Sequence, residues 1–173
     1  MAHKIRVACI LADGFEDAEL RVPYDRMQDE GYEIDIVGLK AGEIIKGKGG
    51  KETVQADKGI DEVKAEDYQA LFIPGGYSPD HLRLDRRFVE LARAFETQHK
   101  TVAAVCHGPQ VLISARLVKG RTLTAWPTIQ DDLGQMGARV KDEAVVVDDN
   151  WITSRKPEDL KEFSEAIVRH LPH

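Results

Sequence analysis

The sequence predicts an α/β sandwich in which helices cover both faces of a parallel sheet. Segments rich in β-branched and apolar residues alternate along the chain with segments of helical periodicity. The strand-like segments are apolar almost throughout, which is typical of strands buried on both faces. With 173 residues and no repeat, low-complexity tract or linker, the chain is expected to form one domain over residues 1–173.

The expected elements follow from hydrophobic periodicity and turn residues. We expect strands at 5–11, 33–39, 69–74, 101–106, 121–126, 143–148 and 150–155. The pattern predicts helices over 15–30, 88–95, 108–118 and 128–137, and a last helix that starts near Pro157. Pro23 is expected to break or kink the first helix. The Gly- and Lys-rich stretch 40–57 predicts a β-hairpin, and its GKGGKET segment lacks the spacing of a phosphate-binding P-loop.

Composition and charge exclude several classes of protein. The formal net charge is -6 and no basic stripe is present, so a nucleic-acid partner is not favoured. No apolar run is long enough to span a membrane and the N-terminus lacks a signal-peptide pattern, so a cytoplasmic location is expected. No GxGxxG follows the first strand, and we expect no cofactor. No metal site is expected either, because no HExxH motif is present and the histidines are scattered: His3, His81, His99, His107, His170 and His173.

The two cysteines do not form a disulfide framework and have different surroundings. Cys9 lies in the apolar run RVACIL and is expected in the core. Cys106 ends a strand and opens a helix, a corner that lifts a side chain out of the sheet. Gly108 permits close backbone approach there, and Pro109 suits a first helical turn. We expect the helix N-terminus to lower the pKa of Cys106 and make it a nucleophile, the alternative being a buried cysteine that merely ends a strand.

Two further loops are expected at the same edge of the sheet, at the carboxyl ends of the strands. Glu16, in ADGFED, follows the first strand and is expected to reach the thiol, either as a hydrogen-bond donor or as a base. The alternative is a first-turn helix acid, a role for which Asp17 and Glu19 compete. The second loop contains Gly75-Gly76, whose backbone N–H groups either form an oxyanion hole or only make a turn.

Two other side chains near these loops have alternative roles. His107 adjoins Cys106 and acts either through its ring as a base or only through its backbone N–H, which would complete the oxyanion hole. Asp80 either caps the following helix or orients His107.

Four sequence blocks resemble the ThiJ/PfpI family over nearly the whole chain. They are GFEDAEL (14–20), FIPGGYSPDHLR (72–83), VCHGPQVLISA (105–115) and VVVDDNWITSRKPEDL (145–160). They are most similar to the branch of PfpI-type intracellular proteases and general stress proteins, within the class I glutamine amidotransferase-like superfamily. The resemblance implies a flavodoxin-like three-layer sandwich, a nucleophile elbow, and a homodimer or homohexamer.

The resemblance also implies roles for individual residues. Cys106 matches the nucleophile of the family, Glu16 the carboxyl that contacts it, and His107 the histidine of a peptidase triad. Gly76 and the N–H of His107 match the oxyanion hole. Asp80 falls where the peptidase triad takes a glutamate from a neighbouring subunit, and its shorter side chain departs from that pattern.

Three functions are consistent with these residues. The first is a cysteine-dependent stress-response enzyme, a deglycase or glyoxalase, that acts on methylglyoxal or glyoxal and their early adducts. The second is an oligomeric intracellular cysteine peptidase. The third is a non-enzymatic redox sensor through oxidation of Cys106. Amidotransferase activity is not expected, because only His170 and His173 follow His107, without an H-P-E sequence.

Overall fold

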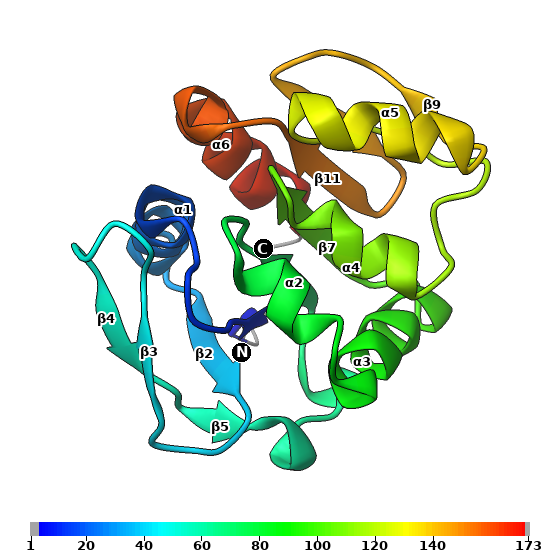
Figure 1. Cartoon of the computed structure of the whole chain (residues 1–173). Coiled ribbons are helices and arrows are strands. Elements are labelled where there is room, and N and C mark those ends of the chain that lie inside the picture. The colour runs from blue at the N-terminus through cyan, green and yellow to red at the C-terminus, as the bar shows by residue number, and fades with distance from the viewer. Residues whose placement is uncertain (1–3, 172–173) are drawn as a thin grey trace.

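A seven-stranded sheet forms the centre of the molecule. The computed structural model describes residues 4–171. The strands of the central sheet are β1 (Arg6–Ile10), β2 (Glu33–Gly38), β5 (Lys58–Gly59), β6 (Ala70–Ile73), β7 (Thr101–Val105), β10 (Val145–Asp148) and β11 (Trp151–Ser154). Their order is β10-β11-β7-β6-β1-β2-β5 (Figure 1). All neighbouring pairs are parallel except β10 and β11, which confirms the mostly parallel sheet.

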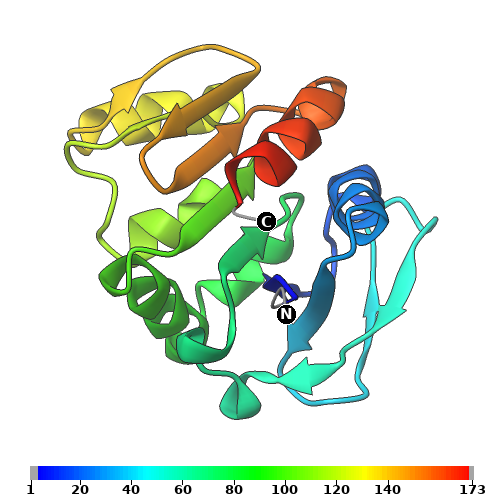
Figure 2. The ribbon, with the colours of Figure 1, turned by 180° about the vertical axis from the view of Figure 1, so that it is seen from behind.

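Helices cover both faces of this sheet, which gives three layers (Figures 1 and 2). One face carries α1 (Asp17–Asp29) and α6 (Leu160–His170), and the other carries α2 (Ser78–Leu82), α3 (Arg86–Thr97) and α4 (Pro109–Ser114). The remaining elements are β3 (Ile44–Lys46), β4 (Thr53–Gln55), β8 (Thr122–Leu123), α5 (Pro127–Gln135), β9 (Arg139–Val140) and the 3₁₀ turns Ile60–Glu62, Ala65–Asp67 and Pro157–Asp159. The arrangement is the expected flavodoxin-like α/β sandwich.

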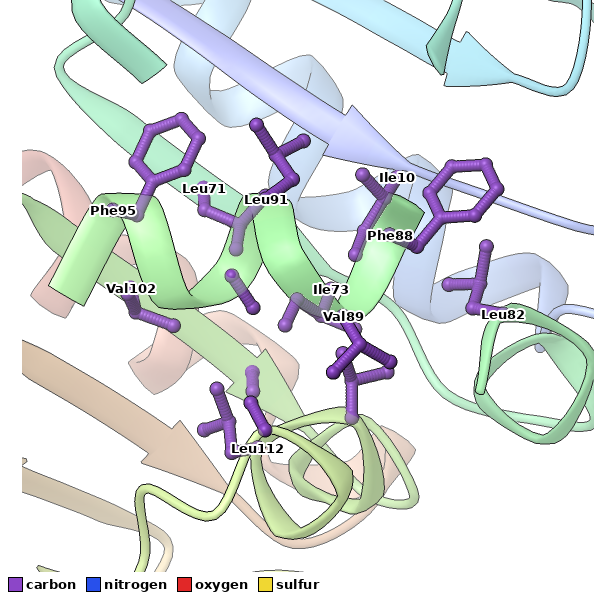
Figure 3. Packing of buried hydrophobic residues seen from close by; sticks show 14 of the residues in the cluster. Ile10, Leu71, Ile73, Leu82, Phe88, Val89, Leu91, Phe95, Val102 and Leu112 are labelled. Atoms are coloured by element: carbon purple, nitrogen blue, oxygen red, sulfur yellow. The ribbon is translucent and has the colours of Figure 1, made fainter. Parts of the chain in front are cut away.

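Alternate residues along the strands supply two separate cores. Leu71 and Ile73 face α3, where Phe88 and Phe95 pack against them (Figure 3). Phe72, between them in sequence, points to the opposite core. Because both faces of each central strand are buried, the strands read as continuous apolar runs. Cys9 is fully buried in the second core, as expected.

Three expected elements differ from those observed. Helix α1 continues through Pro23, so the predicted break is wrong: the proline removes one backbone N–H, and the turns on either side are retained. Helix α4 ends at Ser114, because Arg116 adopts a left-handed backbone with φ of 60°. Of the predicted strand 121–126, only Thr122–Leu123 forms a strand, and it pairs with β9 outside the central sheet.

The loops at the carboxyl ends of β1, β6 and β7 lie at one edge of the sheet, as expected for parallel strands. The predicted hairpin is present as the antiparallel pair β3–β4, which lies beside α1 in both views (Figures 1 and 2). None of the helices within residues 4–171 has the length and apolar character that crossing a bilayer requires.

Candidate functional site

Cys106 occupies a strained corner between β7 and α4. Its φ is 62°, a left-handed conformation that side chains other than glycine rarely adopt. Its N–H donates to the carbonyl of Ser154 at 3.0 Å, and its carbonyl accepts from the N–H of Trp126 at 2.9 Å. Any side chain at Gly108 would collide with the carbonyl of Ile73, so a glycine is required there. Neighbouring segments thus hold the corner from both sides, and the predicted strand-to-helix corner is confirmed.

Glu19 is the carboxyl group that interacts with this thiol. It is fully buried on the first turn of α1, and its Oε1 accepts the N–H of Gly75 at 2.9 Å. The Glu19 carboxyl and the Cys106 thiol are close enough for each to influence the pKa of the other. Oε2 of Glu19 is buried and has no hydrogen-bond partner among residues 4–171. Burial, with a further contribution from the nearby charge of Glu16, raises the pKa of Glu19 to about 8.

Glu16 has a different partner from the one expected. It precedes α1, is partly exposed, and its Oε2 lies 2.9 Å from Nζ of Lys48. Glu19, and not Glu16, is the carboxyl that influences the pKa of Cys106, and the catalytic role expected of Glu16 stays a prediction. The reason is helical geometry: Glu19 is one turn further into α1, on the side that faces the sheet, whereas Glu16 lies at the rim.

The pKa of Cys106 shifts in the direction opposite to the one expected. Only 6% of the residue is exposed, and burial is the largest influence on the thiol. Burial and the neighbouring Glu19 carboxyl raise the pKa of Cys106, while the backbone N–H of His107 and the charge of Lys48 oppose the shift. The predicted acidification is therefore wrong: desolvation and the Glu19 carboxyl outweigh the backbone N–H of His107 at the start of α4, a helix of only six residues.

The ring of His107 contacts the thiol directly. Its Nδ1 lies 3.3 Å from Sγ of Cys106. The ring also stacks on Trp126, with 6.0 Å between ring centroids. Burial and the charge of Lys48 lower the pKa of His107, so the imidazole is neutral at pH 7 and one ring nitrogen is available as a proton acceptor.

Two backbone N–H groups at the site have no carbonyl acceptor among the described residues: those of Gly76 and His107. Gly76 has φ of 75°, and a side chain there would collide with the backbone of Glu16 and Gly14. The close approach of these two loops fixes the direction of the Gly76 amide. Gly76, His107 and Cys106 line the same cleft.

Asp80 is exposed on α2 and does not cap the next helix, whose N-terminus is capped by Asp85. Within residues 4–171 of this chain, Asp80 makes no hydrogen bond with His107. Its expected role in a neighbouring subunit's triad, and the homodimer or homohexamer that this requires, stay predictions.

The cleft over the thiol has a volume of about 490 Å³. Besides the expected residues it is lined by Glu19, Lys48, Trp126, Lys156 and Glu158, which sequence reasoning missed. Lys48 reaches the cleft because the β3–β4 hairpin is fastened to the start of α1. For Lys48, Trp126 and Lys156 the sequence carries no local signal, since each comes from a segment distant in the chain.

The described residues contain no group of three or more His, Cys, Asp or Glu side chains placed to hold a metal ion. Of the histidines considered above, His3 and His173 lie outside the described residues.

Comparison with known proteins identifies the family. A model of the DJ-1/PfpI family matches residues 5–170. Protein/nucleic acid deglycase 2 of Escherichia coli is 45% identical over 167 residues, which cover 96% of this chain and 97% of that protein. An uncharacterised protein of Staphylococcus aureus is 47% identical over 168 residues, 96% of this chain and 98% of its own length.

Solved structures agree with this result. DJ-1beta of Drosophila melanogaster superposes with a TM-score of 0.90 at 28% identity, covering 98% of this chain and 91% of that one. A two-domain protein of Anabaena variabilis, with DJ-1/ThiJ/PfpI-like and ferritin-like domains, gives a TM-score of 0.94 at 39% identity. The match covers 98% of this chain, which spans 50% of that longer protein. The molecule is thus a flavodoxin-like α/β protein with a thiol at a strand-to-helix corner. It belongs to the DJ-1/PfpI family.

Proposed function

We propose that this protein is a cysteine-dependent enzyme that acts on methylglyoxal or glyoxal and their early adducts, as a deglycase or glyoxalase, with Cys106 as nucleophile. The main support for this proposal is that the Cys106 thiol lies in a cleft, with the Glu19 carboxyl and the His107 ring beside it. The name of the Escherichia coli relative, a protein/nucleic acid deglycase, supports the reaction class. A small cleft with an acid–base group on each side of the sulfur suits a small carbonyl substrate.

Glu19 activates the sulfur in this proposal. The pKa of Glu19 is about 8 and that of Cys106 is raised from its usual range, so the carboxyl ionises before the thiol. The Glu19 carboxylate then takes the thiol proton as Sγ forms a bond to the aldehyde carbon. A base with a pKa near 8 is stronger than an ordinary carboxylate, which offsets part of the cost of a buried thiolate. Glu16 takes no part in this proton transfer and holds Lys48 at the rim.

The remaining steps balance as an isomerisation followed by addition of water. Attack on the aldehyde of methylglyoxal places a negative charge on its oxygen, which the N–H groups of Gly76 and His107 stabilise. A proton then moves from the former aldehyde carbon to the neighbouring ketone carbon through His107, the ketone oxygen takes the proton that Glu19 removed from the thiol, and a thioester results. Water adds to the thioester and the thiolate leaves, which gives lactate and restores Cys106. With an amine adduct as substrate, the amine is the additional leaving group.

A cysteine substitution with a matched control tests the nucleophile. We expect Cys106→Ala to reduce lactate formation from methylglyoxal to the uncatalysed rate, because no other described side chain in the cleft is a thiol. Cys9→Ala is the control, since Cys9 is fully buried and does not line the cleft, and it should retain activity. Lactate is measured enzymatically in an amine-free buffer. Equal lactate output from Cys106→Ala and the wild type would overturn the assignment.

A further inference from the structure

A second cavity lies between α2, α3 and α4, outside the catalytic cleft. Its volume is about 380 Å³, and four arginines line it: Arg83, Arg86, Arg93 and Arg116. Glu90 is the single acidic residue in its described lining. The three helices lie side by side in Figure 1, with α4 in contact with both α2 and α3. Such a concentration of positive charge is unexpected in a chain of net charge -6.

The arginines of this cavity lack the carboxylate partners that other arginines have. Six arginines elsewhere pair with carboxylates at 3.0 to 2.6 Å, namely Arg6, Arg21, Arg26, Arg87, Arg121 and Arg155. In the cavity, Arg83 donates only to the hydroxyl of Ser114, at 2.7 Å. Arg86 and Glu90 are 3.8 Å apart and both exposed. Arg93 and Arg116 have no ion pair within residues 4–171.

Arg93 points most directly to a missing ligand. Its Nε is buried and has no hydrogen-bond acceptor among the described residues. A buried donor without an acceptor costs roughly 1–3 kcal/mol, and more when the group is charged. Val89, one turn earlier on α3, supplies an apolar wall that faces α4 (Figure 3) and keeps water from one side of the cavity. Because no hydrogen bond or ion pair engages the guanidinium group of Arg93 within residues 4–171, its terminal N–H groups are available to a ligand in the cavity.

We propose that this cavity binds a phosphate group. A phosphate offers several strong acceptor oxygens on one tetrahedral centre, and guanidinium groups match that geometry in a bidentate manner. It would accept hydrogen bonds from the guanidinium groups of Arg93 and Arg116, which have no carboxylate partner among the described residues, and would neutralise the excess charge of the four arginines. The site is separate from Cys106 and goes beyond the proposed carbonyl chemistry. The phosphate is either free, carried by a mononucleotide, or part of a nucleic-acid backbone.

Binding is measured by calorimetry and by thermal unfolding at constant ionic strength, with chloride in place of the ligand as reference. The probes are inorganic phosphate, AMP and a short single-stranded DNA oligonucleotide. We expect at least one to bind and raise the unfolding temperature, and the tightest of the three identifies the carrier. Arg93→Met, which keeps an unbranched stem of similar reach, should weaken that binding at least tenfold. Arg139→Met, at an exposed arginine on β9, is the matched control and should bind like the wild type.

The unfolding temperature of the ligand-free protein distinguishes a binding role of Arg93 from a purely structural one. Because Arg93→Met removes an unsatisfied buried donor, we expect the ligand-free variant to unfold at the same or a higher temperature than the wild type. If Arg93→Met unfolds at a lower temperature than the wild type, the binding affinity is measured in Arg116→Gln instead. Arg116 is exposed, so this substitution is not expected to disturb the fold. Three results would overturn the proposal. They are an unchanged affinity in Arg116→Gln, equal affinity of Arg93→Met and the wild type, and no binding of any of the three probes. Lactate formation from methylglyoxal should be unaffected by Arg93→Met, so this test stands apart from that of Cys106.

Discussion

The sulfur of Cys106 and the carboxyl of Glu19 form a coupled pair at the bottom of the cleft. Both are buried, and each influences the pKa of the other. A thiol acidified by a helix end alone would react at neutral pH with little dependence on its neighbours. In the proposed reaction the reactivity of the sulfur depends on the ionisation of one carboxyl, so we expect Glu19 to set the pH dependence of activity.

We expect activity to rise with pH through about 8, because the ionised form of Glu19 accepts the thiol proton and the pKa of Glu19 is about 8. Glu19→Gln should remove this rise and lower kcat/KM by roughly a hundredfold or more. The check is the pH profile of lactate formation. Glu16→Gln changes the neighbouring carboxylate at the rim and should retain the rise in activity near pH 8. If Glu16→Gln loses this rise and Glu19→Gln keeps it, Glu16 is the base.

The sequence was sufficient to predict Cys106 but not its carboxyl partner. The corner at Cys106 has a local signal, since an apolar strand meets Gly108-Pro109. Choosing between Glu16 and Glu19 depends on the helical phase of α1, and the buried residues Pro23 and Met27 follow Glu19 at intervals of four. That stripe could have assigned Glu19 to the inner face. The raised pKa of the thiol was not predictable, because burial depends on segments far away in the chain.

At the scale of elements, the β3–β4 hairpin is fastened to the start of α1 and carries Lys48 to the cleft. The N–H of Lys48 donates to the carbonyl of Phe15 at 2.9 Å. The carboxylate of Asp17 accepts the N–H groups of Gly49 and Lys51 at 3.3 and 2.8 Å. Asp17 is buried, whereas Gly49 and Lys51 are exposed, so these hydrogen bonds tie a surface loop to a buried carboxylate. The first-turn acid of α1 therefore shapes the loop that forms one wall of the cleft.

Asp17→Ala should release this loop, because the two amides lose their buried acceptor. We expect a loss of about 1–3 kcal/mol in the free energy of unfolding and faster amide hydrogen exchange over 47–51. Asp13→Ala is the control: its exposed carboxylate accepts one N–H, that of Lys46, at 2.9 Å. Hydrogen exchange followed by mass spectrometry compares the two variants. Similar protection of 47–51 in Asp17→Ala and wild type would show that the loop holds its shape without this carboxylate.

Elements with strong local patterns were predictable, and those decided by tertiary contacts were not. The apolar runs of β1, β6 and β7 and the stripe of Phe88, Leu91 and Phe95 on α3 appear where expected. Helix α4 is shorter than its apolar pattern suggests, because the backbone turns at Arg116. The segment after it looks like a long strand, but Trp126 instead caps the N-terminus of α5, and its N–H donates to the carbonyl of Cys106.

At the scale of the whole molecule, the buried carboxyl gives folding a specific dependence on pH. The pKa of Glu19 is about 8 in the folded protein against a usual value of 4.5. The folded state therefore binds a proton that the unfolded state has released between these two values. Its contribution to stability is complete below about pH 4.5 and is lost as pH rises through about 8.

We expect the free energy of unfolding of the wild type to fall relative to that of Glu19→Gln as pH rises across this window. The difference in slope should approach about 1.4 kcal/mol per pH unit, because one proton is involved. Urea unfolding at several pH values measures it. Other titrating groups are common to both proteins and cancel in the comparison. Parallel stability curves between pH 5 and 8 would mean that Glu19 is ionised in the folded protein.

The residues of the cleft lie at the carboxyl ends of the parallel strands, so the opposite edge of the sheet is available for engineering. The connections there include 98–100, before β7, and 149–150, between β10 and β11. Nε2 of His99 lies 3.3 Å from the carboxylate of Asp149, both side chains are exposed, and neither residue lines the cleft. Exposed turn positions tolerate inserted sequence best, and these are His99 and Asp149, because Asn150 is buried and its side chain donates to Glu96 and to the carbonyl of Lys100. A fluorescent reporter or a new pair of chain ends can therefore be introduced at this edge without disturbing the corner that holds Cys106.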